Sequence, residues 1–145
     1  MQAISLLLLA ACSSPPLPIP VDARPMYGAP DIPRPTLLRQ ADARFIATAS
    51  AEFGGNRKLA SLSWTGQGDR LLASGQLDDA TRRYNEAWLL DPENFEVHEG
   101  FARVLLARGQ PAAAVPHLRK AIELCPDNTE RSALTAELAR LSPER

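Results

Sequence analysis

The chain has 145 residues, of which 45% are hydrophobic and 23% are charged, a composition typical of a globular protein that excludes a wholly disordered chain. Its 16 basic and 17 acidic residues give a net charge of -1, which argues against a protein that binds the backbone of nucleic acids. Two cysteines are too few for a disulfide framework or a four-cysteine zinc site.

The N-terminus carries no charged side chain before Cys12 and contains an apolar run from Leu6 to Ala11. A bilayer-spanning helix takes about 20 residues, so this run suits the apolar core of a secretory signal peptide instead. The run ends in Leu9-Ala10-Ala11-Cys12, which resembles the lipobox of bacterial lipoprotein precursors. The resemblance implies that residues 1–11 are a signal peptide, that Cys12 carries a covalent lipid including palmitate-type acyl chains, and that the protein is anchored in the cell envelope facing the periplasm.

The start of this signal departs from the family's pattern, because Met1-Gln2-Ala3 lacks the usual Lys or Arg. Either the true translation start lies upstream or the signal is a weak one. The alternative interpretation is an apolar N-terminus with an incidental cysteine. By resemblance to enterobacterial lipoprotein sorting, Ser13 in place of aspartate after the cysteine favours the outer membrane.

Proline is concentrated in the next segment, where eight of the 13 prolines lie between Pro15 and Pro35. Because proline fixes φ and lacks an N–H donor, we expect polyproline-like geometry here. About 22 such residues at ~3.1 Å each could reach ~65 Å. Residues 12–35 are therefore predicted to be the lipidated cysteine and a Pro-rich linker, and residues 36–142 a helical domain.

The first helix of that domain is indicated by apolar residues that recur at three- and four-residue spacing between Leu37 and Phe53. Gly54-Gly55 is expected to end this helix, and Asn56 to cap the next one.

Between Ser61 and Asn128 the sequence repeats itself at an offset of 34 residues. The matched pairs include Leu71 and Leu105, Gly75 and Gly109, Ala80 and Ala114, Ala87 and Ala121, Leu90 and Leu124, Pro92 and Pro126, and Asn94 and Asn128. Period and residue types resemble the tetratricopeptide repeat, a hairpin of two antiparallel α-helices. The resemblance implies two repeats, at about 61–94 and 95–128.

The residue sizes along the repeats fit close packing of helices. Gly75 and Gly109 are expected to end the first helix of each unit in the left-handed conformation. Asp91 is expected to cap a helix that begins at Pro92. Pro116 lies one turn inside a helix, where it removes one hydrogen bond. Small residues are expected where helices approach closely and large ones between them: Gly68, Ala80, Ala102 and Ala114 are the small set, and Tyr84, Trp88, Leu105 and Leu118 the large set.

Two repeats rarely close a core alone, so flanking helices are expected. Leu134, Leu138 and Leu141 predict a capping helix over 129–141. The fold class is therefore all-α, with about six helices. The string from Tyr84 to Pro92 is similar to one in small bacterial tetratricopeptide-repeat lipoproteins, a group for which the resemblance implies no reaction.

No motif for catalysis or metal binding is present. His98 and His117 fall on different predicted helices, with His98 expected to pack between helices and His117 to face outward. Cys125 is expected to be a small buried residue, with a reactive thiol as the alternative. We therefore expect no catalytic residues, no metal, no enzymatic activity and no cofactor beyond the lipid on Cys12.

The remaining candidate for a functional site is a binding surface. In tetratricopeptide repeats the first helix of each unit lines a concave groove through its second, fifth, ninth and twelfth positions. This groove should carry acids beside apolar spots, with one main cation, and would capture a peptide. The alternative is that the acids are ordinary solvated helix surface. With two residues of the terminal helix, the expected groove residues are Leu62, Thr65, Asp69, Leu72, Glu96, Glu99, Arg103, Leu106, Glu130 and Glu137.

The sequence thus predicts a membrane-anchored adaptor that holds a segment of another envelope protein in its groove, without binding nucleic acid. One alternative is a pilotin-like or assembly factor for an outer-membrane complex. Another is a cell-wall-related small-ligand binder or enzyme accessory. A third is a homo-oligomer in which a neighbouring copy fills the groove.

Overall fold

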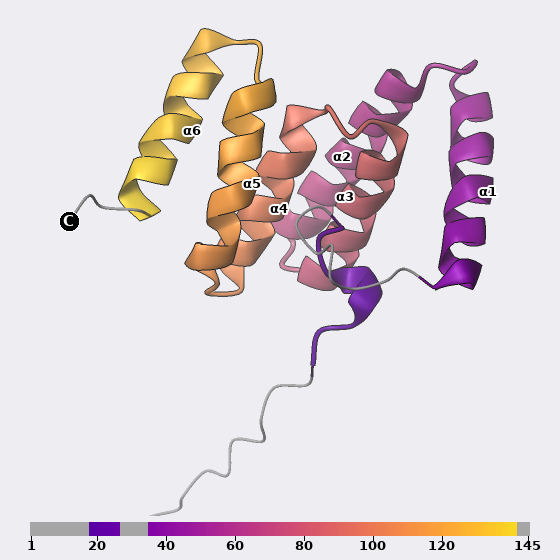
Figure 1. Cartoon of the computed structure of the whole chain (residues 1–145), viewed down its shortest axis with the longest axis horizontal. Coiled ribbons are helices and arrows are strands. Elements are labelled where there is room, and N and C mark those ends of the chain that lie inside the picture. Colours follow the sequence, from indigo (N-terminus) through magenta and orange to yellow (C-terminus); the bar gives the residue numbers. More distant parts are fainter. Residues whose placement is uncertain (1–17, 27–34, 142–145) are drawn as a thin grey trace, which may run out of the picture.

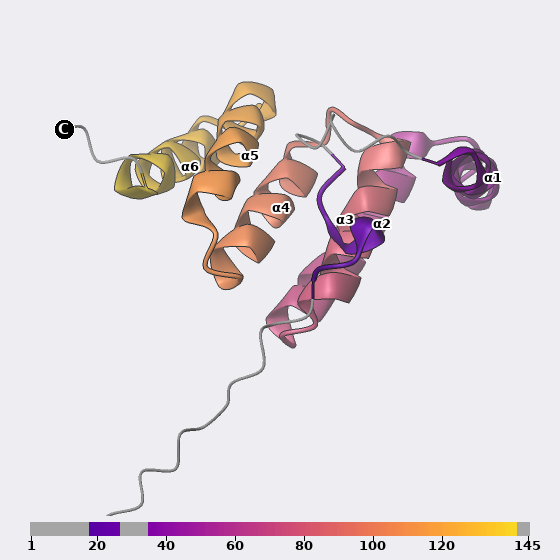
Figure 2. The ribbon, with the colours of Figure 1, turned by 60° about the horizontal axis from the view of Figure 1, so that its bottom comes forward.

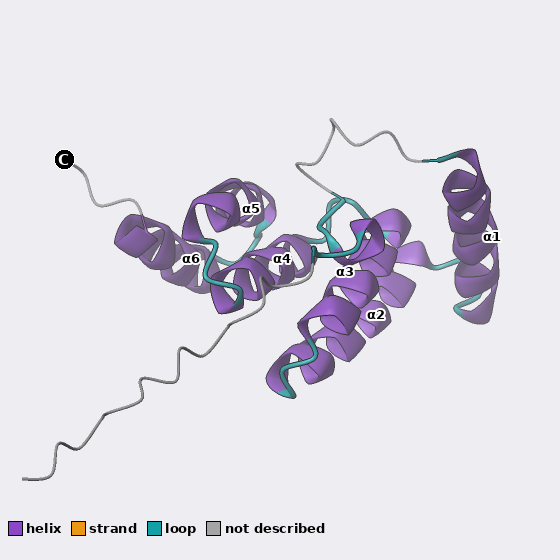
Figure 3. Ribbon diagram, turned by 90° about the horizontal axis from the view of Figure 1, so that it is seen from below, coloured by secondary structure: helices purple, strands orange, loops and turns teal. Residues whose placement is uncertain are grey.

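The computed structural model describes residues 18–26 and 35–141. Its described part contains six α-helices and no strand, which confirms the all-α expectation (Figures 1 and 3). The helices are α1 (Thr36–Glu52), α2 (Arg57–Ala73), α3 (Leu77–Leu90), α4 (Phe95–Ala107), α5 (Pro111–Leu124) and α6 (Asn128–Leu141), preceded by a 3₁₀ turn, η1 (Val21–Ala23). None of these helices is long and apolar enough to cross a membrane. The expected signal peptide and Cys12 lie outside the described residues.

The helices form a row of antiparallel neighbours. α2 pairs with α3 and α4 pairs with α5, and these two hairpins pack on each other through α3 and α4. α1 and α6 stand at the two ends of the row (Figure 1). Each end helix thus covers a face that a hairpin would otherwise expose to water, which is what an array of stacked repeats requires at its ends.

The turns between the helices follow from local chemistry. Gly75 (φ 77°) and Gly109 (φ 71°) adopt the left-handed conformation after α2 and α4, as expected of glycines that end helices. Asn56 caps α2, because its Oδ1 accepts a hydrogen bond from the Leu59 N–H at 3.0 Å.

The start of α4 differs from the expectation that Asp91 caps a helix beginning at Pro92. Asp91 instead ends α3 in an extended conformation, and its Oδ1 accepts from the Glu93 N–H at 3.2 Å. Helix α4 begins at Phe95, three residues after Pro92, and the Asn94 side chain accepts from the Glu96 N–H at 3.1 Å. A turn at Pro92 and Glu93 therefore separates the two hairpins, and Asn94 is the cap.

Asn94 also ties three helices together beneath the surface. Its Nδ2 donates to the Ser61 hydroxyl at 2.9 Å and to the Thr65 hydroxyl at 3.2 Å, both on α2. The Ser61 hydroxyl in turn donates to the Ala87 carbonyl of α3 at 2.9 Å. Because these groups are buried, each bond prevents the cost of an unsatisfied polar atom.

The centre of the domain is the ring of Tyr84, which is fully buried between the two hairpins. It lies against glycine on both sides: a Cβ added to Gly68 of α2 would stand 2.6 Å from its Cε1, and one added to Gly100 of α4 would stand 2.5 Å from the same atom. Phe101 packs on the ring edge-on, with centroids 6.0 Å apart. Only glycine therefore lets α2 and α4 approach this ring from their two directions.

The two histidines and the cysteine of the domain are all buried. His98 is fully buried and its Nε2 lies 2.9 Å from the Pro92 carbonyl, as expected for a residue packed between helices. The outward orientation expected for His117 is wrong: its side chain is 4% exposed and its ring centroid lies 5.3 Å from that of Phe101. The reason is that Phe101 reaches from α4 to α5 and makes that side of α5 part of the core. Burial lowers the pKa of His117 to about 4, so the ring is neutral at pH 7. Cys125 is a free, buried thiol, as expected.

The N-terminal segment 18–26 departs from the extended geometry expected of a tether. It contains η1 and lies against α3, and Ala23 is fully buried there (Figures 1 and 2). The physical reason is a set of three hydrogen bonds between the Asn85 side chain of α3 and the segment's backbone, two donated by the Asn85 amide and one accepted by it.

The glycine contacts of Tyr84 predict that alanine at Gly100 and alanine at Gly66 change the free energy of unfolding differently. Gly100→Ala should lower the free energy of unfolding by at least about 1 kcal/mol, because the buried ring cannot move away from the new methyl group. Gly66→Ala is the matched control, since its Cβ would meet only Arg70 Nη1 at 3.9 Å and alanine favours a helix by up to about 1 kcal/mol. Urea unfolding of both variants measures this, and equal effects at Gly66 and Gly100 would contradict it.

Candidate functional site

The residues expected to line a groove lie on α2, α4 and α6, the alternate helices of the row. Each contributes carboxylates to one electrostatic cluster: Asp69 from α2, Glu96 and Glu99 from α4, and Glu130 and Glu137 from α6. We call these five residues the acidic cluster. Glu96 is electrostatically coupled to Asp69 and Glu130, and Glu99 to Asp69, Glu130 and Glu137, so these acids lie near enough to influence one another.

Asp69 is the best-anchored member of the acidic cluster. Its Oδ1 accepts a hydrogen bond from the Tyr84 hydroxyl at 2.7 Å and one from Arg103 Nη1 at 3.1 Å. Tyr84 thus links the buried centre to the groove surface, and burial together with Asp69 raises the pKa of its hydroxyl. The side chains of Arg103 and Asp69 are 44% and 46% exposed, so their ion pair contributes little stability but orients the cation over the groove.

The two glutamates of α4, Glu96 and Glu99, both have raised pKa values. Burial, followed by the charges of Asp69 and Glu130, raises the pKa of Glu96 above its ordinary value of 4.5. The pKa of Glu99 is raised by burial first, lowered by Arg103, and raised again by Asp69 and the two acids of α6. A cation entering the groove would relieve this repulsion, because it offsets both the lost hydration and the like charge.

A hollow of about 250 Å³ lies beside Leu62, a side chain that is 47% exposed. Its apolar lining is Leu62, Phe95, Leu124 and Pro126, and its polar lining includes Lys58, Asp91, Glu93 and Asn94. Glu96 lines the same hollow, so an apolar contact and a negative charge lie side by side. This combination suits a peptide that carries an apolar side chain next to a basic one.

Three of the expected groove residues have other surroundings. Leu72 and Leu106 lie partly buried against the hydrophobic core. Thr65 is 1% exposed, so it is not available to a ligand. Its hydroxyl donates to the Ser61 carbonyl at 2.9 Å and accepts from Asn94, because the fifth position of the first repeat faces the start of α4.

Sequence reasoning missed three contributors to the site. Lys58 and Phe95 line the apolar hollow, and the Tyr84 hydroxyl supports Asp69. The signal for Tyr84 was present, because a tyrosine rather than a phenylalanine at a packed position needs a partner for its hydroxyl. Lys58 gave no such signal, since it precedes the first predicted repeat.

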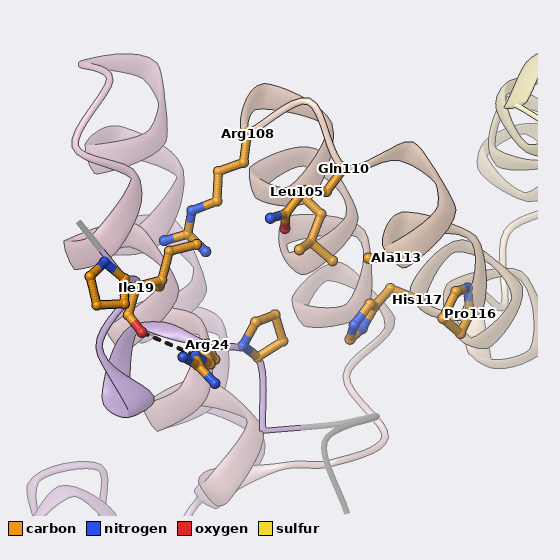
Figure 4. A pocket seen from close by; sticks show the side chains of 10 residues that line it. Ile19, Arg24, Leu105, Arg108, Gln110, Ala113, Pro116 and His117 are labelled. Atoms are coloured by element: carbon orange, nitrogen blue, oxygen red, sulfur yellow. Dashed lines mark hydrogen bonds between the residues drawn. The ribbon is translucent and has the colours of Figure 1, made fainter. Parts of the chain in front are cut away.

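Metal sites and cavities are the other kinds of candidate site in the described chain. Within residues 18–26 and 35–141, no group of three or more His, Cys, Asp or Glu side chains could hold a metal ion. A second cavity, of about 430 Å³, lies outside the groove between the N-terminal segment and the helices α4 and α5 (Figure 4).

The raised pKa of Glu99 has a consequence for stability. A carboxyl whose pKa is higher in the folded state stabilises the fold when protonated and loses that contribution as the pH rises through its folded pKa. Glu99→Gln should therefore raise the free energy of unfolding at pH 7, by roughly 0.5 kcal/mol for a half-buried side chain. The gain should vanish as the pH falls below 4.5, where the wild-type carboxyl is protonated too.

Urea unfolding across this pH range measures the effect. Glu93→Gln is the control, because Glu93 is exposed outside the acidic cluster. A Glu99→Gln protein that is less stable than the wild type at pH 7 would contradict the prediction.

Comparison with known proteins supports the predicted tetratricopeptide repeats. The sequence profile of the tetratricopeptide repeat family matches residues 71–138. The chain is similar to DnaJ homolog subfamily C member 3 of Bos taurus, at 45% identity over 62 residues, and to that of Rattus norvegicus, at 39% over 79. The human protein of that name is 44% identical over 62 residues.

These matches cover 43%, 52% and 43% of this chain but only 12%, 16% and 12% of the relatives, so the chain spans a small part of the relatives' length. No solved structure gave a significant match. Together with the helical hairpins, the matches support a tetratricopeptide-repeat protein and hence a role in protein–protein interaction.

Proposed function

We propose that this chain is a lipid-anchored adaptor of the bacterial cell envelope that holds a segment of another envelope protein in its groove and carries out no chemistry itself. The observation that carries the proposal is that the exposed Leu62 and Glu96 line one hollow, and that Glu96 and Glu99 are electrostatically coupled to acids of α2 and α6. A surface of this kind fits an extended or helical peptide with basic residues and an apolar anchor.

The charge arrangement supports binding better than it supports stability. Glu96 and Glu99 keep raised pKa values in the folded protein, so their charges are an energetic cost to the free domain. A basic segment would lower both pKa values on binding. Binding should then weaken as the pH falls through the raised pKa values of these carboxyls, because protonation removes the attraction.

The anchor rests on a different observation. Leu9-Ala10-Ala11-Cys12 supports lipidation at Cys12, and Ser13 supports sorting to the outer membrane. An anchored adaptor gains from its position, because confinement to a membrane surface raises the effective concentration of partners held there.

Photo-crosslinking in cells tests the groove. A photoreactive amino acid at Leu62 should give an adduct with one defined envelope protein, whereas the same group at Arg119, exposed on α5, should give none. Charge reversal by Glu96→Lys together with Glu99→Lys should reduce the Leu62 adduct at least tenfold, a loss of about 1.4 kcal/mol. An adduct that is unchanged by charge reversal, or equal yields at the two positions, would exclude groove binding.

Fractionation of the same cells separates the anchor from the groove. The wild-type chain should sediment with the outer membrane, and the Cys12→Ala variant should be released into the soluble fraction. Sedimentation of both proteins alike would contradict the anchor and leave the crosslinking result to stand alone.

A further inference from the structure

We propose that the outer face of α3 is a second peptide-binding site, separate from the groove, and that residues 18–26 of this chain are a dissociable occupant that fills it. The site is centred on Asn85, a side chain that is 6% exposed. It does not depend on the groove or on the lipid anchor.

Asn85 recognises the main chain of the segment. Its Nδ2 donates to the carbonyls of Asp22 at 3.0 Å and Arg24 at 2.8 Å, and its Oδ1 accepts from the Met26 N–H at 2.9 Å. Both donor hydrogens and the oxygen of the amide are therefore used on backbone groups of a segment about sixty positions away. An amide used in this way recognises the backbone of the bound segment whatever its side chains.

Side-chain contacts add selectivity for the sequence around Ala23. This residue is fully buried, so the site accepts only a small side chain there. Arg108 Nη1 donates to the Ala23 carbonyl at 3.1 Å, and the guanidinium is held in place by Asp78 at 2.6 Å. Next to Ala23, the Asp22 carboxylate pairs with Arg82 at 2.7 Å. The site is thus suited to an acidic residue followed by a small one.

The packing around the segment is that of a docked peptide. A cavity of about 430 Å³ remains between Ile19, Pro25 and the helices, with Leu105 and His117 on the far wall (Figure 4). Protein cores are packed closely and leave few voids larger than a water molecule. Of the described segment only Ala23 is buried, and all of the bonds to Asn85 can be replaced by water if the segment leaves.

Covalent linkage explains why the site is filled in the wild-type chain. Eight residues, 27–34, join the segment to the helical domain. A short link of this kind gives an effective concentration on the order of 1 mM, so even a weak site stays occupied in cis. A free peptide competes against that concentration and should bind well only when the chain's own segment cannot dock.

Binding of a fluorescent peptide with the sequence of residues 18–26 to full-length protein tests the proposal. Ala23→Arg in the protein should expel its own segment and strengthen peptide binding at least tenfold over the wild type, measured by fluorescence anisotropy. Adding Asn85→Ala to that variant should remove the gain. Ala136→Arg, at an exposed alanine of α6, is the matched control and should bind as weakly as the wild type.

Two further readouts keep the outcome unambiguous. Circular dichroism should show unchanged helix content in Ala23→Arg, since Ala23 lies outside the six helices. In an otherwise wild-type chain, Asn85→Ala should speed hydrogen exchange of the Met26 amide at least tenfold. Peptide binding that is equal in the wild type and Ala23→Arg, or a Met26 amide indifferent to Asn85, would overturn the proposal.

Discussion

The arrangement of the domain depends on one steric constraint, the ring of Tyr84 held between two glycines. Gly68 and Gly100 belong to the first helices of the two hairpins, and neither could carry a Cβ without meeting the ring. The ring therefore sets how closely α2 and α4 approach. Since its hydroxyl reaches Asp69 at 2.7 Å, the same side chain that spaces the helices also orients a carboxylate on the concave surface.

The hydrogen bond between Tyr84 and Asp69 also affects the charges around it. Asp69 holds Arg103, and Arg103 is the one charge that lowers the pKa of Glu99 against burial and three like charges. The acids of α4 and α6 thus share a surface that is negative and partly dehydrated. The raised pKa values of Glu96 and Glu99 indicate that their charged forms cost the folded domain some stability, and the basic ligand proposed above would offset that cost.

The sequence predicted the elements whose signals are local or periodic. The offset of 34 residues indicated the hairpins, and Gly75 and Gly109 marked two helix ends. The predictions were wrong where a contact with a neighbouring helix determines the orientation of a side chain. Thr65 turned inward because Asn94 bonds it, and His117 became core because Phe101 reaches it.

The docked segment could not have been predicted in the same way. A proline-rich composition predicts an extended tether, but it says nothing about a hydrogen-bonding amide about sixty positions away, which holds residues 18–26 and their 3₁₀ turn against α3. The acidic cluster lies on α2, α4 and α6, whereas the N-terminal segment 18–26 lies against α3.

The most direct test of the central claim is a double-mutant cycle between Gly100 and Tyr84, measured by urea unfolding. With Tyr84 present, Gly100→Ala should destabilise the protein. In the Tyr84→Leu background the same change should be neutral or stabilising, giving a coupling energy of at least about 1.5 kcal/mol. An equal cost of Gly100→Ala in both backgrounds would show that the ring does not set the approach of the two hairpins.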